Sequence, residues 1–524
     1  MNLLSLQSAH ASPSKVLQFG TIAILSIVIG LVSALYSPLV AGIGASLFTI
    51  AAVALYVHSV AQYQQHLVVT TAVSIDTGVS SRLLFFLLSL SLFLSITIPK
   101  SGRMIRNIPI TTANIVILLT LMLWVLRLFF SEGSIFRLPV STSLFAFILY
   151  GIAAVLIGFV NDNSPKFIII DFVAFIGFIP VYFLVCTVLR TPRQLQKVVW
   201  LIILSLILVC TYGMLQKQIG FKQVAVPGIT EQYDLILYSQ FGGRWNIIAG
   251  GLQKVYSTFQ NGNIFGHHLA TFLPFFGGFF LGLRTPRKKL FFFGVFLFCC
   301  YILILTYSRG ALVGTISGFM VLAVISKTIR LKAFIGIVVV FFLLLGLLWF
   351  YADQAGMERY DVRKIAVDPN SFSAGRLQRA QEVLKGFAAL PLFSKVFGLG
   401  FGGTLSTPYW DYDYVDNLYL TLLYKMGVVG IGILAWVIGH LLRTLLLFRT
   451  KIDDFRYQAL IHGGIAGLVA SLVHNLADTL WLFPPLAANF WFLAGISIAV
   501  GAIATQNAQQ EKSAAQQTGR QRVR

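Results

Sequence analysis

The sequence predicts an all-α fold, a polytopic membrane helix bundle, and three observations support this class. Of the 524 residues, 57% are hydrophobic and only 11% are charged, whereas soluble domains are typically about 25% charged. The mean hydropathy is +0.82. Apolar runs of roughly 20 residues, the length that crosses a bilayer core, recur along the chain. These features exclude a soluble enzyme, a disordered protein and a fibrous repeat.

Fourteen apolar runs are predicted to form transmembrane helices. They cover residues 17–35, 38–57, 83–99, 109–130, 140–160, 167–189, 198–216, 264–283, 290–307, 310–326, 333–352, 416–440, 458–477 and 486–505. Because the third is short and the ninth and tenth are nearly contiguous, we expect about 12–14 helices. We expect residues 1–505 to form a single transmembrane domain. The Gln- and Ala-rich residues 506–524 are predicted to be a disordered cytoplasmic tail.

The distribution of Lys and Arg predicts the orientation, because cytoplasmic loops are enriched in both. With the N-terminus in the cytoplasm, dense basic groups at 284–289 and 327–332 lie inside, and 100–106 is the exception. We therefore attribute the net charge of +21 to basic loops that set the membrane topology, and we expect no nucleic-acid partner. The two longest loops, about 217–263 and 353–415, then lie outside. In the second loop, residues 376–387 have the apolar spacing of an amphipathic helix, so this loop is expected to be partly helical.

Arg309 lies between two apolar runs, in the sequence Tyr307-Ser308-Arg309-Gly310. One interpretation is an interfacial arginine whose charge reaches water. The other is a guanidinium that binds an anionic head group, because its planar donors contact two phosphate oxygens at once.

Arg376 and Arg379 share a face of the predicted loop helix, since they are three residues apart. They form either a solvated basic face, with Glu382 as an ion-pair partner, or a second phosphate-binding group. Asp416 precedes the apolar run that begins with Asn417. It is either an ordinary helix N-cap or a carboxylate that accepts a proton from a sugar hydroxyl.

Other polar groups in or near the spans have less specific interpretations. Asn263 and His474 suit helix capping or helix–helix hydrogen bonding as well as substrate contact. His267 and His268 are adjacent and would diverge on a helix, so they form a poor zinc site. Neither a metal site nor a nucleotide-binding loop is indicated, and no cofactor is expected. Asp171 and Lys425 are charges within spans for which the sequence predicts no partner.

Four motifs in order resemble the O-antigen ligase/polymerase family of bacterial membrane glycosyltransferases. The first is 258–263, Thr-Phe-Gln-Asn-Gly-Asn, in which Gly262 stands where the family usually has Pro. The second is Ser308-Arg309-Gly310. The third comprises Gly375-Arg376-Leu377 and, further on, the glycine-rich 398–402. The fourth is Asp416-Asn417-Leu418-Tyr419-Leu420, followed by Gly427 and Gly430.

The resemblance implies transfer of a glycan from undecaprenyl diphosphate at the outer face of the bacterial inner membrane, by an inverting, metal-independent mechanism. The substrates would be an undecaprenyl-diphosphate-linked glycan donor and acceptor within the lipid bilayer, with a chain-length regulator protein as a further partner. The expected catalytic residues are Asp416, Arg309 and Arg376. The expected substrate-binding residues are Arg379, Asn263, Asn417, Tyr419, Arg244 and His474.

Ligases of this family typically have His at the position of Asp416, so the sequence favours the polymerase branch. The alternatives are a ligase that transfers glycan to a lipid core or a protein and, from another class, a lipid-linked sugar flippase or exporter. The long outer loop and the arginines at the outer ends of the spans favour an enzyme.

Overall fold

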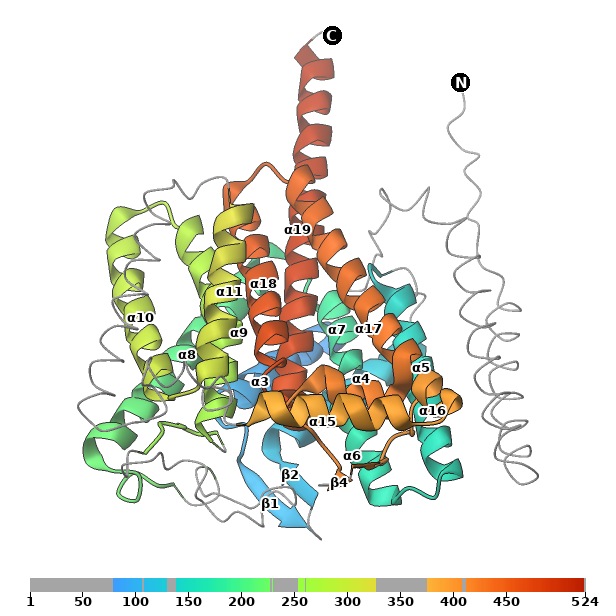
Figure 1. The fold of residues 1–524 in the computed structure, drawn as a ribbon. Helices are drawn as coiled ribbons and strands as arrows, with labels where there is room; N and C mark the ends of the chain where they lie inside the picture. Colours follow the sequence, from blue (N-terminus) through green and yellow to red (C-terminus); the bar gives the residue numbers. More distant parts are fainter. Residues whose placement is uncertain are drawn as a thin grey trace, which may run out of the picture.

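The computed structural model describes residues 79–105, 108–129, 138–226, 229, 253–259, 261–326, 375–407 and 411–522. Three predicted spans, 17–35, 38–57 and 333–352, lie outside the described residues. Within the described residues the chain is an all-α polytopic bundle, as predicted (Figure 1). Seven helical spans of this part are long and apolar enough to cross a membrane.

The elements follow the predicted spans closely. In chain order they are α3 (Val79–Thr97), β1 (Gly102–Ile105), β2 (Ile108–Thr111), α4 (Thr112–Phe129), α5 (Ser141–Val160), α6 (Pro165–Phe175), α7 (Ile179–Val188), α8 (Pro192–Ile219), α9 (Gly262–Gly282), α10 (Pro286–Leu305), α11 (Arg309–Ile325), α15 (Arg376–Ala389), α16 (Leu392–Phe397), β3 (Leu405–Ser406), β4 (Asp411–Tyr412), α17 (Leu418–Lys451), α18 (Phe455–His474), the 3₁₀ helix η5 (Leu480–Leu482) and α19 (Pro484–Arg522). Both strand pairs are short antiparallel hairpins. The span predicted at 167–189 consists of two helices, α6 and α7.

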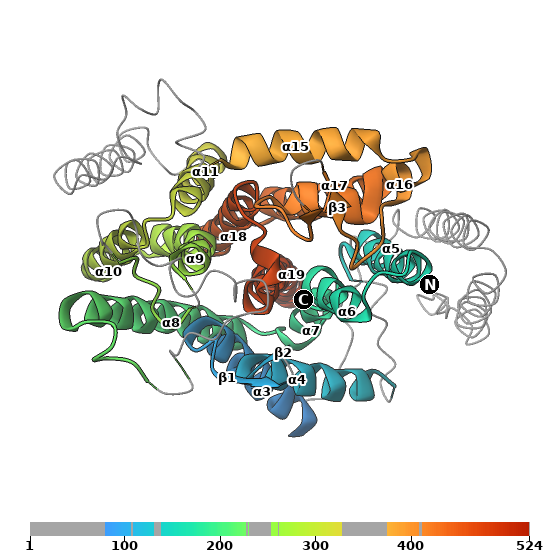
Figure 2. The same ribbon diagram turned by 60° about the horizontal axis from the view of Figure 1, so that its bottom comes forward.

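Helix α19 runs through the middle of the bundle (Figure 2). Its membrane-spanning window is 94% buried, whereas only 22% of the corresponding window of α17 is buried. Among the described helices, α17 is therefore peripheral and α19 central.

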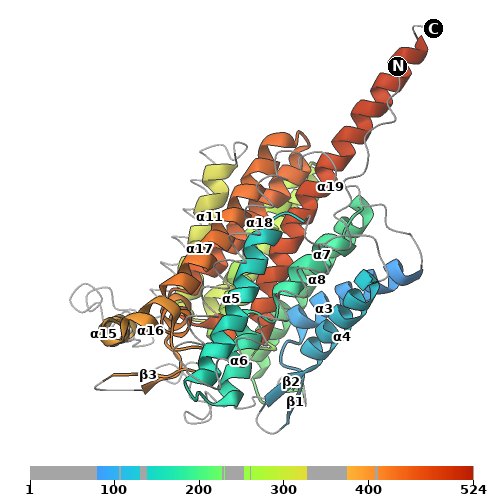
Figure 3. The ribbon, with the colours of Figure 1, turned by 90° about the vertical axis from the view of Figure 1, so that its right-hand side faces the viewer.

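Helix α19 continues to Arg522 and extends beyond the bundle (Figure 3). It thus includes residues 506–522 of the segment for which a disordered tail was expected, and 523–524 lie outside the described residues. This segment is rich in Gln and Ala, which are good helix formers. Because the buried part of α19 already provides the helical nucleus, each further residue adds a hydrogen bond without a nucleation cost.

The helix predicted at 376–387 is confirmed as α15, which extends to Ala389. It lies crosswise to the long helices, at the end of the bundle opposite the C-terminus (Figure 1). Its inner face buries Val383 against Leu405, Val415 and Tyr424. An apolar contact thus fixes α15 over the beginning of α17, and this contact determines where its arginines lie.

Helix α17 is broken at Gly427, which has φ 67° and ψ −175°. Three consecutive carbonyl groups just before the break accept hydrogen bonds from outside the helix. The backbone N–H groups of Leu399 and Gly400 donate to the carbonyls of Tyr424 (2.8 Å) and Lys425 (3.0 Å). The Tyr150 hydroxyl, from α5, donates to the carbonyl of Met426 (2.8 Å). The glycine-rich segment 398–402 and Tyr150 therefore supply backbone hydrogen bonds where the helix is broken.

A buried ion pair holds the other side of the same segment. The Lys425 Nζ lies 2.7 Å from Asp171 Oδ2 on α6, and their side chains are 1% and 0% exposed. Asp171 Oδ2 also accepts from the backbone N–H of Gly402 (2.6 Å), and Lys425 donates to the carbonyl of Gly403 (3.2 Å). The two charges that sequence analysis left without partners thus connect α6, α17 and the glycine-rich segment.

Replacing Gly427 with Ala should destabilise the protein. A left-handed conformation costs a residue with a Cβ about 1–2 kcal/mol, and a Cβ here would lie 2.2 Å from the Val396 carbonyl oxygen. Thermal unfolding of the purified protein in detergent measures the effect. Gly432→Ala is the matched control, because a Cβ at this position of the same helix meets nothing within 4 Å. Equal stability of the two variants would contradict a requirement for glycine at the break.

Candidate functional site

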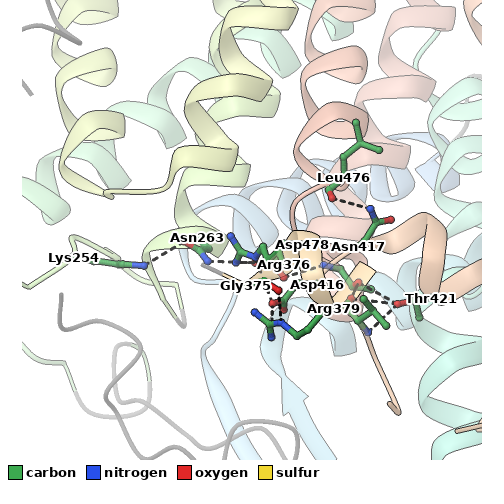
Figure 4. A network of polar contacts seen from close by, with 12 residues as sticks. Lys254, Asn263, Gly375, Arg376, Arg379, Asp416, Asn417, Thr421, Leu476 and Asp478 are labelled. Carbon is green, nitrogen blue, oxygen red and sulfur yellow. Dashed lines mark hydrogen bonds and ion pairs between the residues drawn. The ribbon is translucent and has the colours of Figure 1, made fainter. Parts of the chain in front are cut away.

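Three residues predicted from the sequence meet at the junction of α15 and α17. The Arg379 Nη1 lies 3.0 Å from Asp416 Oδ2, and the Arg376 Nε lies 3.4 Å from the same oxygen. Arg376 also reaches across to a second carboxylate, with its Nη2 3.8 Å from Asp478 Oδ2. Figure 4 shows these side chains converging from the loop helix and from the connections beside α17 and α18. Arg376 is therefore positioned between two carboxylates.

The N-cap of α17 is Asn417, and not Asp416. The Asn417 Oδ1 accepts from the backbone N–H of Leu420 (3.0 Å), and its Nδ2 donates to the carbonyl of Leu476 (2.9 Å). Capping by the neighbouring amide leaves the Asp416 carboxylate directed to the arginines. The capping interpretation of Asp416 was thus wrong by one residue. Asn417 was expected to bind substrate, and its amide instead joins α17 to the end of α18.

Asn263 lies in the first turn of α9 and connects two charged groups. Its Nδ2 donates to Asp478 Oδ2 (3.3 Å), and its Oδ1 accepts from Lys254 Nζ (3.4 Å). The neighbouring Asn261 caps α9 through its Oδ1, which accepts from the backbone N–H of Ile264 (2.9 Å). Asn263 therefore does not cap the helix, and its amide is available to the site.

Arg309 is the first residue of α11, after the N-cap Ser308. One of its guanidinium nitrogens, Nη1, is buried. At the next position, a Cβ on Gly310 would lie 2.8 Å from His474 Nε2 and 3.1 Å from the Ala477 Cβ. Glycine thus allows α11 to begin directly against the end of α18, in the stretch that leads to Asp478.

The other predicted residues lie further from this cluster or outside the described residues. The Tyr419 hydroxyl donates to the carbonyl of Leu472 (2.8 Å), so it fastens α17 to α18. His474 is buried, with its ring centroid 5.0 Å from that of His267. Arg244 lies outside the described residues. Among the described residues, no group of three or more His, Cys, Asp or Glu side chains could hold a metal ion.

The charges of the cluster are accessible to different degrees. The side chains of Arg376 and Arg379 are 27% and 42% exposed, and those of Asp416 and Asp478 are 35% and 17% exposed. Burial raises the pKa of Asp478, and the negative charge of Asp416 adds to this, against the effect of Arg376. The cluster therefore offers two partly exposed guanidinium groups, which suit a phosphate, beside carboxylates that can accept a proton.

Asp478 and Lys254 are members of the cluster that were not predicted as site residues. Asp478 lies in a short connection between two spans. A charged residue in such an apolar stretch is the sequence feature that could have identified it as a site residue. Lys254 stands in a loop that carries other charges. Nothing in its local sequence distinguishes it, since its role depends on contact with Asn263.

One comparison with known proteins bears on this geometry. Residues 294–435 match the O-antigen ligase family, which confirms the predicted resemblance. The matched segment includes Arg309, Arg376, Arg379 and Asp416, while Asp478 contacts it from outside through Arg376, and Asn263 contacts Asp478. No curated protein matches the chain.

The capping assignment yields a stability prediction. Asn417→Ala should lower the free energy of unfolding by about 1–2 kcal/mol, because it removes the cap of α17 together with the hydrogen bond to the Leu476 carbonyl. Asp416→Ala keeps the cap and should lower it by less, since its ion pairs are partly exposed. Thermal or denaturant unfolding in detergent compares the two. A larger loss for Asp416→Ala would show that the helix start depends on the carboxylate.

Proposed function

We propose that this chain, which carries an O-antigen ligase family domain over residues 294–435, polymerises undecaprenyl-diphosphate-linked oligosaccharide units into surface polysaccharide. The observation that carries the proposal is the placement of Arg376 and Arg379 beside two carboxylates at one end of a membrane bundle. Glycosyl transfer from a lipid diphosphate needs both kinds of group. It needs cations where the leaving group gains charge and an acceptor for the hydroxyl proton.

The arginines account for the leaving group. When the glycosidic bond to the diphosphate breaks, negative charge develops on the phosphate oxygens. Donors that are already in place stabilise this charge without reorganisation, which is usually a large part of enzymatic rate enhancement. Arg376 and Arg379 are held by Asp416 and by the packing of α15, and Arg309 begins α11 beside the same region. In an inverting displacement the acceptor hydroxyl attacks from the side opposite the diphosphate.

The direction of the helices supports an outer-face site in the bacterial inner membrane. Helix α9 begins at the site with Asn263, and the next helix, α10, begins at Pro286 after the turn at the other end. The basic segment 284–289 therefore lies at the end opposite Arg376 and Asp416. The basic residues between α17 and α18 lie at that opposite end too, and so does the C-terminus of α19 (Figures 1 and 3). Cytoplasmic loops are the basic ones, so the site faces outward.

The second candidate is a ligase that transfers the glycan to a lipid core or a protein, and the family match favours it by name. Polymerase remains our proposal because Asp416-Asn417-Leu418-Tyr419 has a carboxylate where ligases of the family typically have His. Both activities use the same donor and differ in the acceptor, so the product decides between them.

The two carboxylates have different positions relative to the arginines. One oxygen of Asp416 contacts both guanidinium groups, so this carboxylate orients the arginines. Asp478 is more deeply buried, and burial raises its pKa. A base works best when its pKa approaches the working pH. We therefore assign Asp478 as a second candidate for the proton acceptor, beside Asp416.

The activity can be tested with the purified chain in detergent and an undecaprenyl-diphosphate-linked oligosaccharide. We expect a ladder of longer glycans on the same lipid carrier.

Arg309→Ala and Arg376→Ala should each reduce the rate by about 10²–10³-fold, as for the loss of one donor that stabilises developing charge. Arg309→Lys should also be poor, because an ammonium lacks the planar two-oxygen contact. Arg456→Ala, in an exposed ion pair at the opposite end, is the control and should leave the rate unchanged. Transfer only to a lipid-core or protein acceptor would instead identify a ligase.

The pH dependence of this rate separates the two carboxylates. If Asp478 accepts the proton, activity falls as the pH drops through its pKa, and Asp478→Asn should lose about 10²–10⁴-fold. Because the charge of Asp416 raises the pKa of Asp478, Asp416→Asn should move the acid limb of the profile to lower pH. An acid limb that stays in place in Asp416→Asn, with full activity of Asp478→Asn, would exclude Asp478. A loss of about 10²–10⁴-fold in Asp416→Asn alone, with donor binding unchanged, would identify Asp416 as the base.

A further inference from the structure

Lys254 lies in a segment whose backbone is fixed on two sides before α9 begins. The Val255 N–H donates to the carbonyl of Leu305 (3.0 Å), at the end of α10. The Gln216 side chain, from α8, accepts from the Ser257 N–H (2.7 Å) and donates to the Ser257 carbonyl (2.9 Å). Val255 and Phe259 are fully buried. The backbone beside Lys254 is therefore held against α8 and α10.

The side chain of Lys254 passes over the first turn of α9, and glycine at position 262 makes this path available. A Cβ on Gly262 would lie 2.9 Å from the Lys254 Cβ, 3.1 Å from its Cδ and 2.6 Å from the Thr306 carbonyl oxygen. Any larger residue would displace the aliphatic part of Lys254. The ammonium group then lies 3.4 Å from the Asn263 Oδ1.

Asn263 connects this ammonium to the cluster, because its amide offers an acceptor to the cation and a donor to the carboxylate. Its carbonyl oxygen faces the cation, and its Nδ2 donates to Asp478 Oδ2 (3.3 Å), which is the oxygen nearest Arg376 (3.8 Å). Figure 4 shows Lys254, Asn263 and Asp478 leading in a row to Arg376. Three contacts, through Asn263 and Asp478, therefore link the ammonium to the guanidinium that we assign to the leaving group.

The charges of the cluster show why a further cation is useful. Arg376 and Arg379 are offset by Asp416 and Asp478, so these four groups together are close to neutral. A lipid diphosphate is an anion with two phosphoryl groups. Besides these two arginines, Arg309 is the cation already assigned to this region, and a further positive charge at a second position along the diphosphate would favour its binding.

We infer that Lys254 is a substrate-binding residue that contacts one phosphoryl group of the lipid diphosphate while the arginines contact the other, with Asn263 positioning the ammonium. This inference rests on the proposed function and deepens it. Lysine suits the role because its ammonium is a compact charge that needs no fixed planar geometry to contact phosphate.

Binding of glycan-free undecaprenyl diphosphate and undecaprenyl phosphate to the purified protein tests the inference. Lys254→Met keeps the aliphatic stem and removes the charge. It should weaken binding of the diphosphate about 10–100-fold, as for a hydrogen bond to a charged group, and weaken binding of the monophosphate much less. Lys254→Arg keeps the charge and should retain most of the affinity. Lys222→Met, an exposed lysine after α8, is the matched control and should bind both lipids as the unmodified protein does.

The outcomes distinguish this inference from the proposed function. If Arg376→Ala weakens diphosphate binding and Lys254→Met does not, the role of Lys254 is wrong and the proposed function stands. An equal loss for both lipids in Lys254→Met would show that Lys254 supports the fold and does not recognise the second phosphoryl group. If the unmodified protein binds neither lipid, both proposals are wrong.

Discussion

The break in α17 at Gly427 imposes the constraint on which the rest of the structure depends. A membrane helix cannot leave carbonyl groups without hydrogen bonds in an apolar environment, since each such group costs several kcal/mol. The carbonyls of Tyr424, Lys425 and Met426 accept from the glycine-rich segment and from Tyr150. The buried Asp171–Lys425 pair anchors the same segment from α6. The segment that follows α15 and α16 is thereby tied into the bundle, so the described part of this loop belongs to the fold.

That attachment explains how a loop helix can carry groups that must be accurately placed. Helix α15 is fixed through Val383 and through the glycine-rich segment beyond it. Arg376 and Arg379 then meet Asp416, which precedes α17, and Arg376 meets Asp478, which follows α18. Each carboxylate belongs to a connection at the end of a spanning helix, so the bundle positions the anions and the loop supplies the cations. Mutual pairing keeps all four charges oriented while their side chains remain partly exposed.

Close backbone approach brings the remaining residues to this end. Gly310 allows α11 to start against His474 and Ala477, and Gly262 allows Lys254 to cross the start of α9. In both places the glycine stands beside a residue with a polar side chain, Arg309 or Asn263. The small residue thus determines how near the polar neighbour lies to the cluster.

The sequence by itself determined the class of fold, most helix positions and the chemical types in the site. Span length and apolar composition are local properties, and so is the spacing that predicts α15, because the bilayer and the helical repeat impose them on any chain. Tertiary structure decided which charges meet. Asp171 and Lys425 are 254 positions apart, and no local pattern joins them. It also decided that Asn417 caps α17, which leaves Asp416 to the arginines, and that Asp478 and Lys254 belong to the cluster. The strength of an ion pair or hydrogen bond depends on distance and burial, and in these cases both come from the packing of helices far apart in the chain.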